Sequence, residues 1–178
     1  MTRQLKFTVL ILAVLMVSIL LTGCGGGSNS ATQVNEEEMV TQQVNKWNSA
    51  WNEKDTNYFR EMFVSENIEL TFIYQESATA YFTIQEFINM ITDTTEGFGL
   101  YWTDDTYQHK LTISNIDVSN GTAQVYSKWY MTNKTDSADK GSIDLYFKLT
   151  KGDKWRINVA EFSNPVNHST PDSLNFLK

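Results

Sequence analysis

Two carboxylates and an imidazole lie close together at one place in this sequence, at Asp104, Asp105 and His109. If Asp105 and His109 share a strand, their spacing of four residues puts both side chains on one face. Asp105 could then orient the ring, and His109 could act as a general base near neutral pH. In the other interpretation, which we favour, the stretch is a solvated strand entrance whose aspartates accept hydrogen bonds from loop amides. A metal site would need a further ligand that the sequence does not supply, so we expect no metal.

Three aromatic residues, Phe98, Tyr101 and Trp102, are interspersed with glycines in a stretch that follows a predicted helix. Aromatic side chains beside glycines could form an adaptable lid over an apolar pocket, with Trp47 and Trp51 as part of its lining. The same side chains could instead fill the space as a plug. The sequence leaves both alternatives open.

A third group of residues shares one face of two predicted strands. Tyr126, Lys128 and Tyr130 alternate with apolar residues on one strand, and Asp144 and Tyr146 do so on the next. Cross-strand tyrosines with paired charges are ordinary stabilisation of an exposed sheet face. Exposed tyrosine is also enriched at protein interfaces, so the three tyrosines are candidates for a binding surface.

The N-terminal segment predicts where the protein works. Arg3 and Lys6 precede an almost wholly apolar run, residues 7–21, and small residues then lead to Cys24. This order is typical of a secretory signal. The alternative is an uncleaved membrane anchor, but the run is shorter than the roughly 20 residues that a bilayer requires.

The end of this segment, Leu-Thr-Gly-Cys at residues 21–24, resembles the lipobox of bacterial lipoproteins. The resemblance implies that residues 1–23 are a signal peptide and that the Cys24 sulfur carries a diacylglycerol, with fatty acids such as palmitate. Two acyl chains suffice for stable anchoring. We therefore expect a protein anchored to the cell membrane through Cys24, on the extracytoplasmic side of a bacterial cell envelope.

The composition narrows the classes of partner. The chain has 14 basic and 21 acidic residues, and cleavage before Cys24 would leave 155 residues (178 minus 23) with 12 basic against 21 acidic, a net charge of −9. This charge argues against attraction to nucleic acid. The mature length fits one domain. Because no phosphate-binding loop, zinc signature or nucleophile elbow is present, we expect no cofactor.

Helical signals follow a short polar stretch. Residues 24–34 are small and polar and predict a flexible tether. Asn35 is a candidate N-cap, and the acidic residues 36–38 suit the first turn of a helix. An apolar stripe at spacings of four, three and four continues that helix, formed by Val40, Val44, Trp47 and Trp51.

Two shorter helices are predicted further along. Asp55 can cap a helix that carries Phe59 and Met62. Thr83 and Glu86 match a capping box in front of a third helix. The stretch from residue 94 to residue 106 is predicted to be irregular.

Alternating apolar residues predict strands over residues 68–75 and 78–82 and, after residue 106, a run of hairpin-linked strands. Ile73 interrupts the polar side of the first of these. A change of phase predicts a bulge near Ser114-Asn115. Asn120-Gly121 predicts a two-residue hairpin turn. Helices separated from an antiparallel meander indicate an α+β domain over residues 35–162, followed by a tail, residues 163–178.

This order of elements resembles the NTF2-like superfamily, also called cystatin-like, which includes the SnoaL-like cyclases. The matching pieces are Trp47-x-x-Ala50-Trp51-Asn52-x-x-Asp55, Phe63 at the end of the second helix, and Lys-Gly-Asp-Lys-Trp-Arg-Ile at residues 151–157. The resemblance covers about residues 36–162 and implies a strongly bent antiparallel sheet wrapped around N-terminal helices as a cone. It also implies a possible homodimer through the sheet.

Fold does not carry function, and the superfamily includes enzymes, binding modules and scaffolds. No catalytic position of its enzymes aligns with this sequence residue by residue. Our leading hypothesis is therefore a membrane-tethered module that binds a small apolar ligand or an envelope protein, with no enzymatic activity. The alternative is a SnoaL-like isomerase, cyclase or hydrolase that uses His109 with Asp105 in a pocket of the cone.

Overall fold

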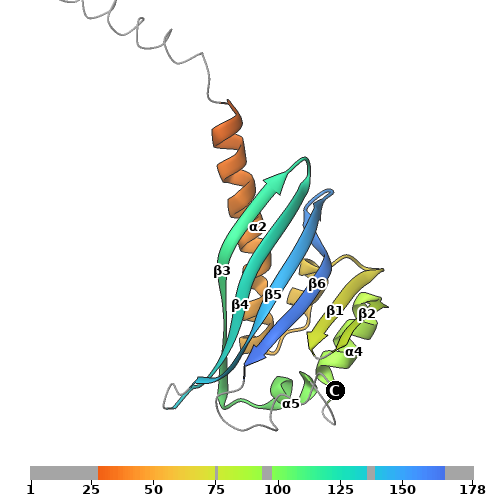
Figure 1. Cartoon of the computed structure of the whole chain (residues 1–178), viewed down its shortest axis with the longest axis vertical. Helices are drawn as coiled ribbons and strands as arrows, with labels where there is room; N and C mark the ends of the chain where they lie inside the picture. Colours follow the sequence, from red (N-terminus) through yellow and green to blue (C-terminus); the bar gives the residue numbers. More distant parts are fainter. Residues whose placement is uncertain (1–27, 75, 94–97, 136–138, 167–178) are drawn as a thin grey trace, which may run out of the picture. The chain divides into compact units, whose positions relative to one another are not determined.

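A computed structural model describes residues 28–74, 76–93, 98–135 and 139–166 of the chain (Figure 1). Contacts divide the chain into two units, Met1–Val34 and Asn35–Lys178. Of the first unit the structure describes residues 28–34, which are helical. The predicted signal peptide and Cys24 lie outside the described residues.

Among the described residues the longest helix is α2, which spans Ser28–Glu53. Its predicted apolar stripe is confirmed, because the side chains from Val40 to Trp51 that form it are buried. The helix begins at Ser28, so Asn35 lies inside it and the N-cap prediction is wrong. Residues 28–34, predicted as part of the tether, are helical as well. Extending an existing helix costs less than starting one, which allows α2 to continue into a polar stretch of modest propensity.

Three shorter helices follow within the described ranges: α3 (Asn57–Met62), α4 (Ile84–Thr92) and α5 (Phe98–Thr103). The capping box of α4 is confirmed, since Thr83 Oγ1 accepts a hydrogen bond from the Glu86 N–H and Glu86 Oε2 accepts one from the Thr83 N–H. Asp55 Oδ1 accepts from the Asn57 N–H at 2.9 Å, although the N-cap residue of α3 is Thr56. Helix α5 lies within the stretch 94–106 that was predicted to be irregular, so that prediction is wrong for residues 98–103, whose sequence carries no cap or apolar period.

In the part of the chain that the structure describes, six strands form one sheet in the order β2-β1-β6-β5-β4-β3. Their bounds are β1 Ile68–Tyr74, β2 Glu76–Phe82, β3 Tyr107–Ser119, β4 Thr122–Asn133, β5 Asp139–Lys151 and β6 Trp155–Val166. All neighbouring strands are antiparallel except β1 and β6, which are parallel. The sheet is therefore mixed, and the expectation of a purely antiparallel sheet is wrong at this junction. Alternation within a strand does not reveal which distant strand becomes its neighbour.

The local features of the meander follow the sequence. The β3–β4 register shifts between Ile113 and Asn115, which confirms the bulge. Asn120 and Gly121 have φ values of 50° and 74°, as a type I′ hairpin turn requires. Strand β6 continues to Val166, so the first four residues of the predicted tail, 163–166, belong to the sheet. Residues 167–178 lie outside the described residues.

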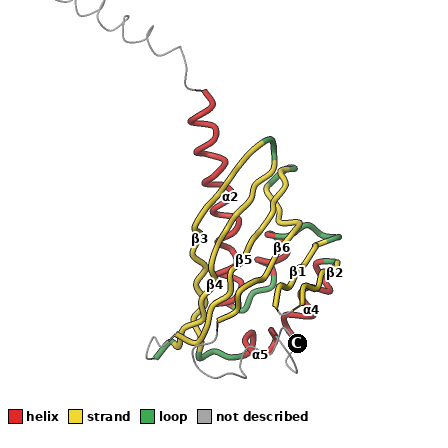
Figure 2. The backbone as a smooth tube through the Cα atoms, in the orientation of Figure 1, coloured by secondary structure: helices red, strands yellow, loops and turns green. Residues whose placement is uncertain are grey.

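The helices cover one face of this sheet, which we call the inner face, and leave the opposite, outer face uncovered by helices (Figures 1 and 2). Ring contacts tie α2 to the inner face, for example between Trp47 and Trp129 at 5.5 Å. Strand β4 shows the consequence, because its residues alternate between buried and more exposed positions along its length. The α+β architecture predicted from the sequence is confirmed.

Candidate functional site

His109 lies in the protein core. It is on β3 with its side chain on the inner face, and 2% of its surface is exposed. Its ring lies near two indole rings, with centroid distances of 5.1 Å to Trp51 and 5.3 Å to Trp129. Asn52 of α2 fixes the backbone there, since its side-chain oxygen accepts from the His109 N–H at 2.9 Å and its amide donates to the His109 carbonyl at 2.8 Å.

The surroundings of His109 make it a weak base. The pKa of His109 is lowered from 6.5 to about 3, first by burial and then by the positive charges of Lys54 and Lys134, while the carboxylate of Asp104 acts in the opposite direction. Among the described residues, neither ring nitrogen has a hydrogen-bond partner. A general base works best when its pKa lies near the operating pH. His109 is therefore a neutral core side chain in this arrangement.

Asp105 does not share a strand with His109. It lies exposed in a turn before β3, which begins at Tyr107, so the shared face that the spacing argument assumed is not formed. Asp104 accepts hydrogen bonds from the N–H and the hydroxyl of Thr106, at 2.8 and 2.6 Å. These contacts fit the interpretation of a strand entrance whose aspartates bind loop amides.

The predicted lid region contributes a core side chain. Trp102 of α5 is buried, and its ring lies 5.4 Å from the ring of Trp51 and 5.8 Å from that of Phe59. This packing is what a plug would make. The side chains of Phe98 and Tyr101 lie outside the described residues.

Large aromatic side chains occupy the space between the helices and the sheet. The ring of Trp47 lies within 6.2 Å of five other aromatic rings, and its pairs with Phe59 and Trp129 have the edge-on geometry that favourable aromatic pairs prefer. The core also holds other fully buried large side chains: Phe63, Phe87, Phe147, Phe162 and Trp155. A small-molecule site in this place would require space that the protein's own side chains fill.

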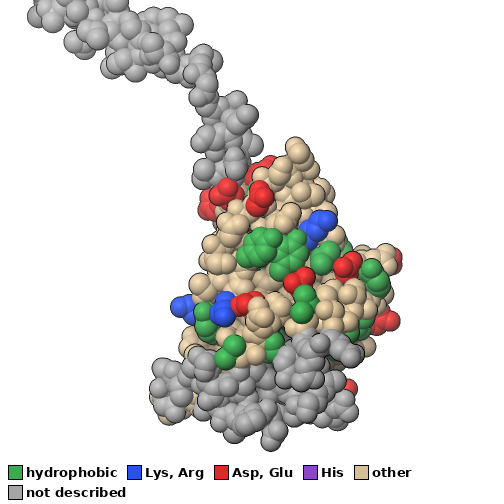
Figure 3. Space-filling model, in the orientation of Figure 1, with side chains coloured by type: hydrophobic (Ala, Val, Ile, Leu, Met, Phe, Trp, Pro, Cys, Tyr) green, Lys and Arg blue, Asp and Glu red, His purple; other side chains and the backbone are tan. Residues whose placement is uncertain are grey.

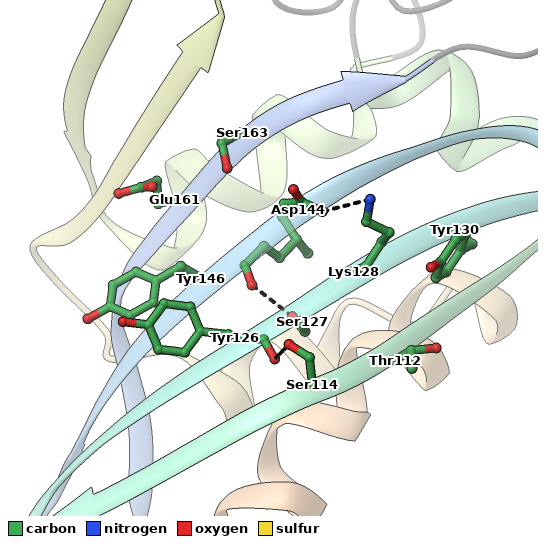
Figure 4. A pocket seen from close by; sticks show the side chains of 11 residues that line it. Thr112, Ser114, Tyr126, Ser127, Lys128, Tyr130, Asp144, Tyr146, Glu161 and Ser163 are labelled. Carbon is green, nitrogen blue, oxygen red and sulfur yellow. Dashed lines mark hydrogen bonds and ion pairs between the residues drawn. The ribbon is translucent and has the colours of Figure 1, made fainter.

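The outer face has a different character. A depression of about 670 Å³ lies on it, across strands β3 to β6 (Figure 4). All three tyrosines predicted as an interface line the depression. The depression is also lined by the Lys128–Asp144 pair, by Glu161 and by hydroxyl-bearing residues, so its surface is partly aromatic and partly polar. The hydroxyl-bearing residues are Thr112, Ser114 and Ser163.

Cross-strand pairs give this depression its structure. Tyr126 and Tyr146 are register partners whose ring centroids are 5.0 Å apart. Lys128 and Asp144 are also partners and form an ion pair at 3.0 Å, and Asn164 donates to the other oxygen of Asp144 at 3.0 Å. Burial, followed by the neighbouring Tyr126 and Glu161, raises the pKa of Tyr146. Its hydroxyl therefore keeps its proton and remains a donor.

Exposed apolar side chains gather on the same face. Five large hydrophobic residues are exposed among the described residues, and four of them lie here: Tyr81 (67%), Tyr126 (45%), Ile73 (40%) and Val166 (39%). Register places them together, since Ile73 pairs with Ser163 of the depression, and Tyr81 pairs with Glu69 on the same side of β1. Figure 3 shows hydrophobic side chains grouped over the sheet beside charged ones.

Solved structures with the same arrangement come from several bacteria. An NTF2-like protein with a cystatin-like fold from Novosphingobium aromaticivorans is similar with a TM-score of 0.62 and 12% identity, over 85% of this chain and 94% of that one. An NTF2-like protein of unknown function from Shewanella baltica has a TM-score of 0.52 and 16% identity, over 77% of this chain and 97% of that one. A protein of unknown function with a cystatin-like fold from Nostoc punctiforme has a TM-score of 0.54 and 16% identity, over 76% of this chain and 93% of that one.

The chain has the NTF2-like fold. No family model matches it, and no curated protein is similar to it in sequence. At identities of 16% or less, the likeness to these NTF2-like structures shows the fold alone.

Two kinds of site can be checked in the described part of this NTF2-like domain. Within residues 28–74, 76–93, 98–135 and 139–166, no three or more His, Cys, Asp and Glu side chains are grouped so that they could hold a metal ion. No helix in the same ranges has the length and apolar character that a membrane crossing needs.

Besides Val166, which was predicted to belong to the tail, sequence reasoning missed two exposed apolar residues of the outer face, Ile73 and Tyr81. A signal for Ile73 was present, because it is an apolar residue on the polar side of β1. Tyr81 joins the group only through the pairing of β2 with β1, and its own short strand contains little pattern. Both residues extend the exposed apolar surface beyond the three predicted tyrosines.

Proposed function

We propose that this protein is a binding module, anchored outside the cytoplasm through a lipid on Cys24, that docks another protein on the outer face of its sheet. The observation that carries the proposal is the contrast between the faces. The inner face is filled by buried aromatic rings, while the outer face combines exposed apolar side chains with a depression of about 670 Å³. Aromatic residues inside a polar rim are typical of protein interfaces.

A second copy of the chain is the partner that this face fits best. In a pair related by a two-fold axis, the same patch meets itself. Lys128 and Asp144 are adjacent on the outer face, so a face-to-face pair allows Lys128 of one copy to approach Asp144 of the other. The tyrosines beside them supply the apolar contact. A stable pair of this kind buries about 800 Å² on each partner.

The lipid anchor supports association between copies. The resemblance of residues 21–24 to a lipobox predicts that the copies share one membrane surface. Tethering two partners raises their effective concentration, so a weak face-to-face contact becomes populated without any new contact. A small apolar ligand inside the domain is less favoured, because it would have to displace the aromatic core.

Thiol crosslinking in intact cells tests this proposal. Cys24 is the only cysteine in the sequence and would be occupied by lipid, so a Thr112→Cys variant, at an exposed position that lines the depression, places one free thiol on the outer face and leaves Lys128 and Asp144 intact. We expect a short bifunctional thiol reagent to yield a product of twice the mass. The matched control is Asn45→Cys, which places a thiol on an exposed position of α2.

Three outcomes separate the possibilities. A doubled mass from Thr112→Cys and none from Asn45→Cys supports docking of a second copy. A crosslinked product that contains a different envelope protein would support a binding module, but it would show that the partner is that protein and not a second copy. Equal or absent crosslinking in both variants would contradict the proposal.

A further inference from the structure

The two edges of the sheet are protected to different degrees. At the β3 edge, the side chains of Asn48 and Asn52 reach from α2 to the strand backbone. Asn52 both accepts from and donates to His109, and Asn48 accepts from the Leu111 N–H. A bulge follows between Ile113 and Asn115. Side chains that occupy backbone groups, and bulges, are ways in which proteins block pairing at an edge.

The opposite edge, β2, has none of these devices within its described residues. It pairs with β1 in continuous register from Phe82 to Glu76, without a bulge. Residues 77–81 are all exposed. The β1–β2 hairpin, residues 68–82, contains no Pro, Lys or Arg. Alternate N–H and C=O groups of an edge strand point away from its neighbour, so β2 presents an open row of donors and acceptors.

Charge and side chains near this edge indicate the type of strand that fits. Glu69 is the register partner of Tyr81, and Glu161 is the partner of Thr71, which itself pairs with Thr79. These two carboxylates therefore lie on the outer face, one and two strands inward from β2. Tyr81 is 67% exposed and offers its ring beside them. A cationic side chain is attracted both by carboxylates and by an aromatic face.

We propose that an extended, basic segment of another protein adds to the edge of β2 as a seventh strand. Backbone hydrogen bonds along β2 supply affinity. Alternate Lys or Arg side chains of the added strand, which lie beside Thr79 and Tyr81 on the outer face, supply specificity, as in other cases of strand addition. The proposal depends on the backbone edge of β2, which lies outside the docking depression on β3 to β6, although Glu161 lines that depression as well. It therefore stands or fails independently of the proposed pairing between copies.

Synthetic peptides and the full chain in detergent micelles test this inference. The probe is a fluorescent seven-residue peptide of alternating Thr and Lys. Its two controls replace Lys by Glu, or carry N-methyl groups on alternate amides so that one edge of the peptide cannot pair. We expect saturable binding of the Lys peptide, about ten-fold weaker binding of the Glu peptide and loss of binding for the N-methylated peptide, measured by anisotropy.

Hydrogen exchange locates the site. With the Lys peptide bound, amides of residues 77–81 should exchange more slowly, while those at the β3 edge stay unchanged. Protection at β3 or across the outer face, without protection in β2, would overturn the inference. Protection of β2 in the chain alone, with a dependence on protein concentration, would also overturn it, because a second copy would then occupy the edge.

A matched pair of variants separates strand addition from general attraction to an acidic protein. Ser77→Lys and Gln108→Lys each add one positive charge at an exposed position, the first on β2 and the second on β3. We expect Ser77→Lys to lower the affinity for the Lys peptide about ten-fold, and Gln108→Lys to change that affinity less than two-fold. Equal weakening by both variants, or by neither, contradicts pairing at β2.

Discussion

The inner and outer faces of the sheet are built from the same strands but serve different ends. On β4, Trp129 points inward and is fully buried, while its neighbours Lys128 and Tyr130 point outward and line the depression. Alternation makes this separation possible, because successive side chains of a strand point to opposite faces. On the inner face, the aromatic side chains are buried and pack against one another. The outer face keeps aromatic and charged groups accessible, which is why we place recognition there.

The largest difference between the faces should appear on truncation of an aromatic side chain. Trp47→Ala removes a fully buried ring that contacts five others and should lower the free energy of unfolding by about 3–5 kcal/mol. Tyr126→Ala removes an exposed ring on the outer face and should cost about 1 kcal/mol or less. Urea unfolding of both variants measures the comparison. Similar losses would mean that the outer face is also structural.

Acid should weaken the inner face through His109. Its pKa is lowered to about 3 in the folded protein, so the unfolded chain, with a pKa near 6.5, binds more protons between these values. Stability from this residue is fully present above pH 6.5 and is lost as the pH falls toward 3. Between pH 7.5 and pH 4.5 the loss should be about 2–3 kcal/mol.

The variant His109→Phe provides the control for this prediction. It keeps a ring between Trp51 and Trp129 but cannot take up a proton. Carboxylates elsewhere in the chain titrate in the same range, so the informative quantity is the difference in pH dependence between the two proteins. If urea midpoints of both proteins fall equally between pH 7.5 and pH 4.5, His109 is not held neutral by burial.

A smaller loss should follow from releasing the protected edge. Asn52→Ala leaves the N–H and the carbonyl of His109 without their side-chain partner and should cost about 1–3 kcal/mol. Asn45→Ala, on an exposed position of the same helix, should change stability by about 0.5 kcal/mol or less. Faster exchange of the His109 amide in Asn52→Ala alone would localise the effect. Equal costs for both variants would show that helix propensity, and not the edge contact, is responsible.

The smallest change in stability should come from the ion pair of the outer face. Lys128 and Asp144 are each about one-third exposed, and such surface pairs contribute about 0–1 kcal/mol. Lys128→Ala should therefore leave the urea midpoint nearly unchanged while it reduces crosslinking or association between copies. A loss of stability without any loss of association would reverse the assignment of this face.

Local features of the fold were predictable because few residues determine them. The capping box needs only Thr83 and Glu86, and the turn needs only Asn120 and Gly121. The buried stripe of α2 follows from the spacing of its apolar residues. In each case the physical cause lies within a short stretch of chain.

Features that depend on distant contacts were not predictable. The parallel pairing of β1 with β6 joins segments about 90 residues apart. Helix α5 contains Trp102, which packs on Trp51 of another helix, and nothing in its own six residues predicts a helix. Asp105 and His109 fell on different elements because β3 begins only at Tyr107. Spacing in the sequence fixes a shared face only when both residues lie on the same strand.

The candidate binding surface could be predicted only in part, because alternation along one strand can be read from the sequence and the pairing of strands cannot. Tyr126, Tyr130 and Tyr146 alternate with buried residues on strands that the sequence indicates clearly, and all three line the depression. Ile73 and Tyr81 join the same face only through the pairing of β1 with β6 and of β2 with β1. The extent of the surface is thus a property of the sheet as a whole.

Sedimentation equilibrium of the full chain in density-matched detergent tests directly whether the outer face docks a second copy. The wild-type chain should be dimeric, Lys128→Glu should be monomeric, and Lys128→Glu combined with Asp144→Lys should be dimeric again, because the swapped charges complement each other. A wild-type chain that stays monomeric at every concentration, or a Lys128→Glu variant as dimeric as the wild type, would contradict the account.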